Sequence, residues 1–260
     1  MDNSTLRSFG ELLTIMNELR EKCPWDRKQT LESLRHLTIE ETYELADAII
    51  DNDLNEIKKE LGDLLLHIVF YAKIGEEKGA FTIKDVMDSL NEKLIRRHPH
   101  IYGDTLAENE EKVKENWEKI KLKEGRKKRV LQGVPKTLPA LVKAYRIQDK
   151  ARGVGFDWEK PHQVWDKVQE ELQELKEEVE SGASKQKIEE EYGDLLFALI
   201  NYARFIDVNP ENALERTNKK FISRFEYLES KTLAANKDMQ KMSLDEMDVF
   251  WNEAKKKERE

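Results

Sequence analysis

Two pairs of carboxylates, each with members three residues apart, are the residues of this sequence best suited to chemistry. Glu171 and Glu174 form one pair, and Glu191 and Asp194 form the other. Residues three apart lie on the same face of a helix, so each pair predicts two carboxylates that project side by side. Antiparallel packing of the two helices would bring the pairs to one point. Four oxygen donors without His or Cys favour Mg²⁺, or Mn²⁺ as a substitute, over zinc or copper.

The same pattern recurs earlier in the chain, as Glu41, Glu44, Glu60 and Asp63. Glu-rich helices usually form solvated surfaces, so the position of the aspartates matters. Asp63 and Asp194 lie in the most apolar stretches of the chain, and each is followed by Leu-Leu. An unpaired carboxylate close to a core is costly, so we expect a cation at both places.

Two glycines in the same apolar stretches also indicate a binding site. Gly62 and Gly193 stand inside predicted helices, where each costs about 1 kcal/mol relative to Ala. They predict close approach of a backbone or a ligand. A di-iron or di-manganese oxidase bundle is a rival reading, but it needs Glu-x-x-His on two helices. The one such spacing, Glu159 to His162, contains Pro161 and so disfavours the rival.

The chain contains an internal repeat. Residues 60–73 align with residues 191–204 at an offset of 131, and seven of the fourteen positions are identical. Trp25-Asp26 matches Phe156-Asp157 at the same offset, and Trp117 matches Trp251. We therefore predict two related domains, at residues 1–124 and 137–260. Residues 125–136, which contain Gly and Pro and begin with a basic cluster, form the predicted linker.

Within each half the apolar residues follow helical spacing. In the second half they predict helices over 164–179 and 188–203, and in the first half a helix around 45–49 followed by one over 57–68. Short links at 51–53 and 181–184 predict antiparallel helix pairs. No convincing strand pattern is present. The predicted fold class is all-α, with two tandem helical bundles.

Composition sets the remaining limits. The 260 residues include 45 basic and 53 acidic side chains, a net charge of −8, which argues against nucleic acid as a partner. A single cysteine fits a reducing compartment. Because the sequence lacks a signal peptide pattern and a long apolar segment, we expect a cytoplasmic protein that does not bind membranes.

Glu-Glu-x-x-Glu followed about seventeen residues later by Glu-x-x-Asp, twice over, resembles the MazG family of nucleoside triphosphate pyrophosphohydrolases. Supporting stretches are Cys23-Pro-Trp-Asp26, Arg96-Arg-His-Pro-His100 and Val154-Gly-Phe-Asp-Trp158. The resemblance covers nearly the whole chain, including the duplication. It implies an all-α homodimer that uses Mg²⁺ to split a nucleoside triphosphate into a monophosphate and diphosphate, with broad base specificity.

By this resemblance, the second half carries the catalytic and metal-binding set Glu171, Glu174, Glu191 and Asp194. One of these carboxylates also activates the attacking water, and which one stays open. The implied substrate-binding set is Lys167, Lys187, Glu190, Lys220, Arg224 and Trp251. The basic residues would hold phosphate oxygens, and Trp251 would offer a flat surface to the base.

The two halves are not equivalent. The counterpart of Lys167 is Leu37, and that of Lys187 is Glu56. Loss of two cations should weaken binding of a polyanion, so we expect the C-terminal copy to carry the main activity. The N-terminal copy would bind metal, act on another nucleotide or serve the dimer. A regulatory module that binds nucleotide without hydrolysis and a helical interaction scaffold remain alternatives. Base and sugar preference stay open.

Overall fold

A computed structural model describes residues 3–103, 113, 116–117, 120 and 129–258. The described residues form helices, turns and irregular segments, with no strand among them, which confirms the all-α prediction. None of the helices in this part of the chain has the length and apolarity needed to cross a lipid bilayer. The chain divides into two compact units, Met1–Trp117 and Glu118–Glu260.

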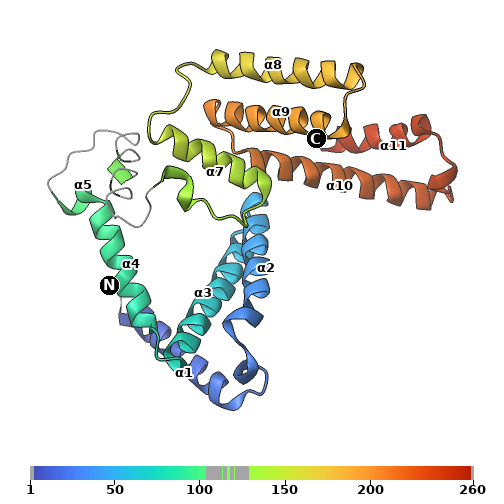
Figure 1. The fold of residues 1–260 in the computed structure, drawn as a ribbon. Coiled ribbons are helices and arrows are strands. Elements are labelled where there is room, and N and C mark those ends of the chain that lie inside the picture. The colour runs from blue at the N-terminus through green and yellow to red at the C-terminus, as the bar shows by residue number, and fades with distance from the viewer. Residues whose placement is uncertain (1–2, 104–112, 114–115, 118–119, 121–128, 259–260) are drawn as a thin grey trace. The chain divides into compact units, whose positions relative to one another are not determined.

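In the first unit, α2 (Leu31–Ile50) and α3 (Leu54–Glu77) form an antiparallel hairpin (Figure 1). The turn between them places Asn52 in the left-handed region, with φ of 55°. The Asp53 side chain then caps α3 by accepting from the backbone N–H groups of Asn55 and Glu56. These local signals reverse the chain within three residues, so the acidic residues of α2 and α3 face each other.

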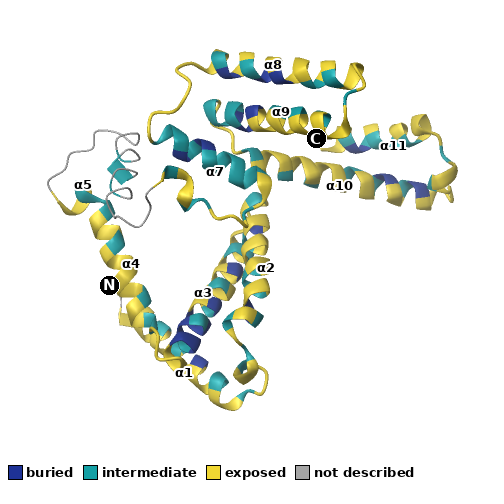
Figure 2. Cartoon of the chain, viewed as in Figure 1, coloured by how far each residue is buried: buried dark blue, intermediate teal, exposed yellow. Residues whose placement is uncertain are grey.

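Four other described elements belong to this unit, and the first of them supplies Met16 to its core. They are α1 (Asn3–Lys22), the 3₁₀ turn η1 (Asp26–Lys28), α4 (Ile83–Arg97) and α5 (Pro99–Tyr102). Helix α1 packs against α3, and Figure 2 shows buried residues gathered along the C-terminal half of α3. The core cluster contains Met16, Leu34, Val69, Phe70 and Ile74.

The second unit repeats this arrangement. Its central hairpin is formed by α8 (Pro161–Glu180) and α9 (Lys185–Phe205), with Gly182 at φ of 70° in the turn. Helix α7 (Ala140–Arg152) packs against α9, as α1 packs against α3. The unit also contains the 3₁₀ turn η2 (Val130–Gly133) before α7, and a second hairpin made of α10 (Pro210–Ala234), the 3₁₀ turn η3 (Met239–Lys241) and α11 (Leu244–Lys257).

The predicted helices and both antiparallel pairs are confirmed. The boundary between the two units along the chain falls after Trp117, ahead of the predicted linker. Residues 125–128 of that linker lie outside the described residues, while its remainder contains η2. The domain ranges 1–124 and 137–260 stay a prediction.

Candidate functional site

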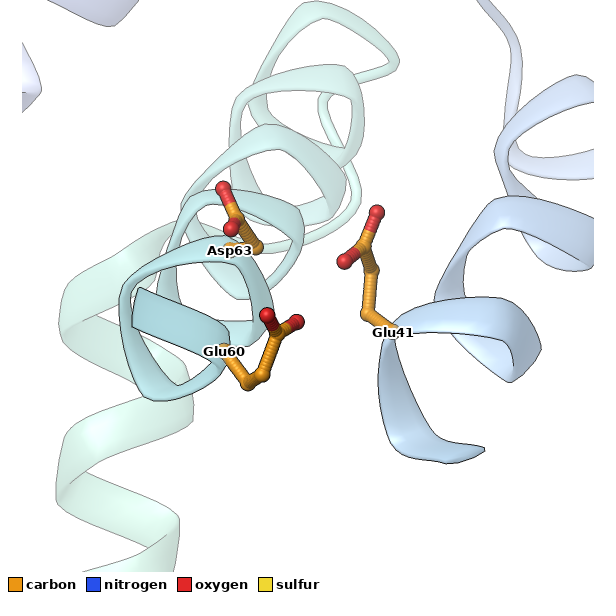
Figure 3. A group of neighbouring side chains, drawn as sticks. All are labelled: Glu41, Glu60 and Asp63. Carbon is orange, nitrogen blue, oxygen red and sulfur yellow. The ribbon is translucent and has the colours of Figure 1, made fainter. Parts of the chain in front are cut away.

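Three carboxylates of the first unit come together across the α2–α3 hairpin. Glu41 extends from α2, and Glu60 and Asp63 extend from α3 toward it (Figure 3). One oxygen from each lies within 4.8 Å of the others. The fourth predicted ligand, Glu44, is exposed and outside this group. Its charge nevertheless acts on both Glu41 and Glu60.

Burial and repulsion make this cluster electrostatically costly. The pKa of Glu60 is raised, first because the side chain is buried and then because Glu44, Asp63 and Glu41 are close. The pKa of Glu41 is also raised, first by desolvation and then by the charges of Asp63 and Glu44. The Glu60 Oε2 atom is buried and has no hydrogen-bond partner among the described residues. A divalent cation would satisfy this oxygen and remove the repulsion, and oxygen donors alone suit Mg²⁺ or Mn²⁺.

The second unit holds the matching cluster. Glu171 from α8 meets Glu191 and Asp194 from α9, again with one oxygen from each within 4.8 Å of the others. Glu171 is buried, whereas Glu174 is exposed and outside the group of three. The pKa of Glu174 is raised, first by desolvation and then by the charge of Glu171. The site thus has the same donor set as the first.

A lysine distinguishes the second cluster from the first. Lys167 Nζ lies 2.8 Å from Glu170 Oε1 and 2.7 Å from Glu171 Oε1. Hydrogen bonds to these two carboxylates raise the pKa of Lys167. The lysine therefore remains charged and supplies a counterion to the buried Glu171. The first unit has Leu37 at this repeat position, and so has no such counterion there.

One detail of the sequence prediction is wrong. The aspartates do not lie near a core, because Asp63 and Asp194 are exposed while Glu60 and Glu171 are the buried carboxylates. The two leucines that follow each aspartate are themselves only partly buried or exposed, so this part of α3 and of α9 does not form a core. Of the two alternatives at the helical glycines, close approach of a backbone is absent from the described residues, and close approach of a ligand stays a prediction. A Cβ atom added at Gly62 or Gly193 would meet no heavy atom within 4 Å.

Lys187 and Glu190, the predicted substrate-binding residues of α9, lie exposed on its first turns. Lys187 forms an ion pair with Glu178 at the end of α8. Glu190 accepts a hydrogen bond of 3.0 Å from Gln186. Neither contact joins these side chains to the carboxylate cluster.

Arg224 and Trp251 form a separate group between α10 and α11. Arg224 pairs with the Glu258 carboxylate, and its guanidinium carbon lies 5.8 Å from the centre of the Trp251 ring. Phe221 packs on the same ring, with 5.0 Å between ring centres. Lys220 is exposed on α10. The structure thus places Arg224 and Trp251 beside each other. Neither belongs to the carboxylate cluster of this unit.

A cavity of about 630 Å³ adjoins the second cluster, within the usual range of small-molecule sites. Lys167, Glu171 and Asp194 line part of it. The other lining residues are Leu131, Ile147, Gln148, Ala151, Gly155, Phe156, Asp157, Trp158, Phe197, Ala198, Asn201 and Arg204. Lys187, Glu190, Lys220, Arg224 and Trp251 are not among them.

Sequence reasoning missed most of this cavity. In the sequence, Phe156 and Asp157 stand out only through the repeat and the family stretch, and Trp158 only through the family stretch. Arg204 binds the Asp157 carboxylate with both terminal nitrogens, one at 2.8 Å, and also donates to Asn201 Oδ1 at 2.9 Å. The repeat aligns Asp157 with Asp26 and Arg204 with Lys73. That pair of opposite charges at matched positions was the available signal.

The di-iron alternative finds no support in the described residues. Both carboxylate groups lack histidine. Glu159 precedes α8, and His162 lies exposed in its first turn, beyond Pro161. His67, on α3, is buried and engaged elsewhere, since its Nδ1 lies 2.8 Å from Thr38 Oγ1.

Comparison with known proteins agrees with this architecture. The model of the MazG nucleotide pyrophosphohydrolase domain matches two segments, residues 29–102 and 159–228, which hold the two acidic hairpins. A Thermotoga maritima protein named nucleoside triphosphate pyrophosphohydrolase/pyrophosphatase MazG is 46% identical over 95% of both chains. The nucleoside triphosphate pyrophosphohydrolase of Escherichia coli strain K12 is 41% identical over 97% of this chain and 99% of its own. This chain therefore belongs to the MazG family, with two copies of the family's domain.

Proposed function

We propose that this protein is a Mg²⁺-dependent nucleoside triphosphate pyrophosphohydrolase. It would convert a ribo- or deoxyribonucleoside triphosphate and water into a monophosphate and diphosphate. The observation that carries the proposal is the second cluster: three convergent carboxylates beside a charged lysine and a cavity of about 630 Å³. The names of the relatives from Thermotoga maritima and Escherichia coli support the same activity.

Glu171, Glu191 and Asp194 would hold Mg²⁺, with Glu174 as a fourth carboxylate close by. When bound, Mg²⁺ screens the charges of triphosphate and carboxylates, polarises phosphate oxygens and lowers the pKa of a coordinated water. Mn²⁺, with the same preference for oxygen ligands, would substitute. Without a cation, the cluster would repel the polyanionic substrate.

The protein's own groups would position the substrate and move a proton. The water oxygen forms a bond to phosphorus as the bridge between the α- and β-phosphates breaks, and one carboxylate of the cluster takes the water proton. Lys167 would bind a phosphate oxygen by leaving its contact with Glu171 once Mg²⁺ neutralises that carboxylate. Lys187, Glu190, Lys220, Arg224 and Trp251 stay the predicted substrate-binding residues outside the cavity.

We assign the main activity to the C-terminal copy. Lys167 and the cavity accompany its cluster, whereas the first unit has Leu37 and Glu56 at the positions of Lys167 and Lys187. Glu56 forms an ion pair with Lys59. That contact engages Lys59, which would otherwise be free to attract phosphate. The set of Glu41, Glu44, Glu60 and Asp63 would bind metal with little turnover.

We also propose that the protein is a cytoplasmic homodimer. Large apolar side chains remain exposed on the hairpin helices of the second unit, among them Trp165, Leu172, Tyr192, Leu196 and Leu199. Exposed apolar surface of this extent is typical of interfaces between chains. Light scattering after size exclusion should give twice the mass of 30.6 kDa, and a monomer at micromolar concentration would contradict the proposal.

One assay tests the proposed reaction. The protein is incubated with Mg²⁺ and each nucleoside triphosphate in turn, and the products are separated. We expect monophosphate and diphosphate in equal amounts, and no products after chelation of the metal. Release of orthophosphate and nucleoside diphosphate would contradict the assigned bond. Tight nucleotide binding without products would favour a regulatory module, and neither binding nor products a scaffold.

A further inference from the structure

We propose that Glu258 competes with the triphosphate for Arg224, and so sets the affinity of the protein for a phosphate chain. The inference rests on the proposed function, in which Arg224 binds a phosphate oxygen. Glu258 belongs to none of the predicted sets of site residues, and it would act only through Arg224.

The contact between Arg224 and Glu258 has the form of a contact between arginine and phosphate. Arg224 Nε lies 3.0 Å from Glu258 Oε1 and 3.1 Å from Oε2, and Arg224 Nη2 lies 2.6 Å from Oε2. Carboxylate and phosphate oxygens bind the planar guanidinium in the same two-pronged way. A phosphate that binds this edge of the guanidinium must therefore displace the carboxylate. A phosphate on the opposite edge is repelled by the charge of Glu258.

The helix that precedes Glu258 does not explain its charge. Glu258 directly follows the last residue of α11 and is its C-cap. A negative charge at this end of a helix is unfavourable, because the carbonyl end of the helix dipole is itself negative. The last turn of α11 accordingly contains Lys255, Lys256 and Lys257. The ion pair with Arg224 offsets the cost of the carboxylate, and a neutral residue in its place should leave α11 intact.

Metal binding would release Lys167 from its carboxylate but would not release Arg224. Lys167 holds Glu171, a proposed metal ligand, so a bound cation takes over that carboxylate. Glu258 is outside the groups of acidic residues that could hold a metal in the described part of the chain. The phosphate chain itself must therefore break the pair with Arg224. Because this costs the same for a short chain as for a long one, the pair favours ligands with many phosphate charges.

Glu258→Gln tests the competition, because it removes the charge and one acceptor oxygen while nearly keeping the side-chain size. The matched control is Glu253→Gln. Glu253 also extends from α11 to α10, where its Oε2 accepts a hydrogen bond of 3.2 Å from Tyr227 Oη. The control thus removes the same charge from the same hairpin. Both changes are also made in an Arg224→Met background.

Three quantities are measured for each protein. Calorimetric titration gives the dissociation constant of inorganic tripolyphosphate in the presence of Mg²⁺, diphosphate release gives KM for a nucleoside triphosphate, and thermal unfolding gives Tm. We expect Glu258→Gln to lower the dissociation constant and KM about fivefold, the range of an exposed ion pair. Glu253→Gln should change neither constant, and Glu258→Gln should change neither in the Arg224→Met background. Tm should stay the same in Glu258→Gln.

Several results would overturn the competition. Weaker tripolyphosphate binding in Glu258→Gln would mean that the carboxylate instead orients Arg224 for phosphate. Equal gains in Glu258→Gln and Glu253→Gln would reflect net charge alone. Unchanged tripolyphosphate binding, with or without a lower Tm, would leave the contact as a link between α10 and α11. Failure of the proposed function would appear differently, as absence of diphosphate release from the unmodified protein.

Discussion

Lys167 Nζ and Glu171 Oε1 lie 2.7 Å apart on successive turns of α8, with the carboxylate buried. This contact places a lysine ammonium at the carboxylates that we propose to bind a divalent metal. Because one ammonium cannot neutralise three convergent carboxylates, the contact leaves the cluster a net negative charge. The same lysine is placed to donate a hydrogen bond to a phosphate oxygen when metal replaces it at Glu171.

Replacing the lysine separates these two roles. In Lys167→Met, the second cluster should bind Mn²⁺ several-fold more tightly in the absence of nucleotide, because the competing cation is gone. KM for the triphosphate should rise about tenfold, because a charge-assisted hydrogen bond to phosphate is lost. Calorimetric titration of Mn²⁺ in a Glu41→Gln background reports the second cluster, with Leu37→Met as the control. Weaker Mn²⁺ binding in Lys167→Met would contradict competition between the two cations.

Removing one metal ligand from each unit tests the asymmetry of the halves. Glu171→Gln should lower kcat by about 100-fold or more, since loss of metal charge at the reacting phosphate costs several kcal/mol. Glu41→Gln, the equivalent change in the first unit, should alter kcat by less than about threefold, because Leu37 stands there in place of the phosphate-binding lysine. Equal losses in steady-state diphosphate release would contradict the assignment to the C-terminal copy.

The carboxylate repulsion in the first unit predicts a gain in stability on neutralisation. Glu60 is buried against Glu41 and Asp63, so Glu60→Gln should raise the Tm of the metal-free protein at pH 7 by several degrees. The same variant should lose most of the stabilisation that Mg²⁺ confers on the first unit. Thermal unfolding with EDTA and with Mg²⁺ measures both effects. The exposed Glu44→Gln serves as the comparison, and an equal gain there would argue against burial as the cause.

Acid should weaken the first unit through His67. Burial lowers the pKa of His67 below its ordinary value of 6.5, so the folded state binds fewer protons than the unfolded state near that pH. Stability is therefore greatest above about pH 6.5 and falls as the pH drops through the range between the unfolded and folded pKa values. Urea unfolding at pH 7.5 and pH 6 should show a smaller loss in His67→Gln than in the unmodified protein. The exposed His36→Gln should behave as the unmodified protein does, and the same loss in all three would exclude His67 as the cause.

Much of the fold and the location of the site follow from the sequence alone. The apolar spacing within 164–179 and 188–203 predicts α8 and α9 because helical periodicity is a local property. The short links then require antiparallel pairing, and i, i+3 spacing brings Glu191 and Asp194 to one face. Repetition of the pattern made the carboxylates stand out from the other acidic residues of a highly charged chain.

Only the tertiary structure decided which carboxylates are buried and what surrounds them. Glu60 and Glu171 are buried, whereas Asp63 and Asp194 in the apolar stretches are exposed. The difference arises because burial depends on which face of a helix packs against a neighbour. The cavity is likewise assembled from α7, the segment around Phe156 to Trp158, α8 and α9, whose residues are far apart along the chain. Whether such residues enclose a cavity or a core depends on side-chain volumes at facing positions. Asn201 and Phe70 occupy equivalent positions in the repeat, and one lines a cavity while the other is buried in a core.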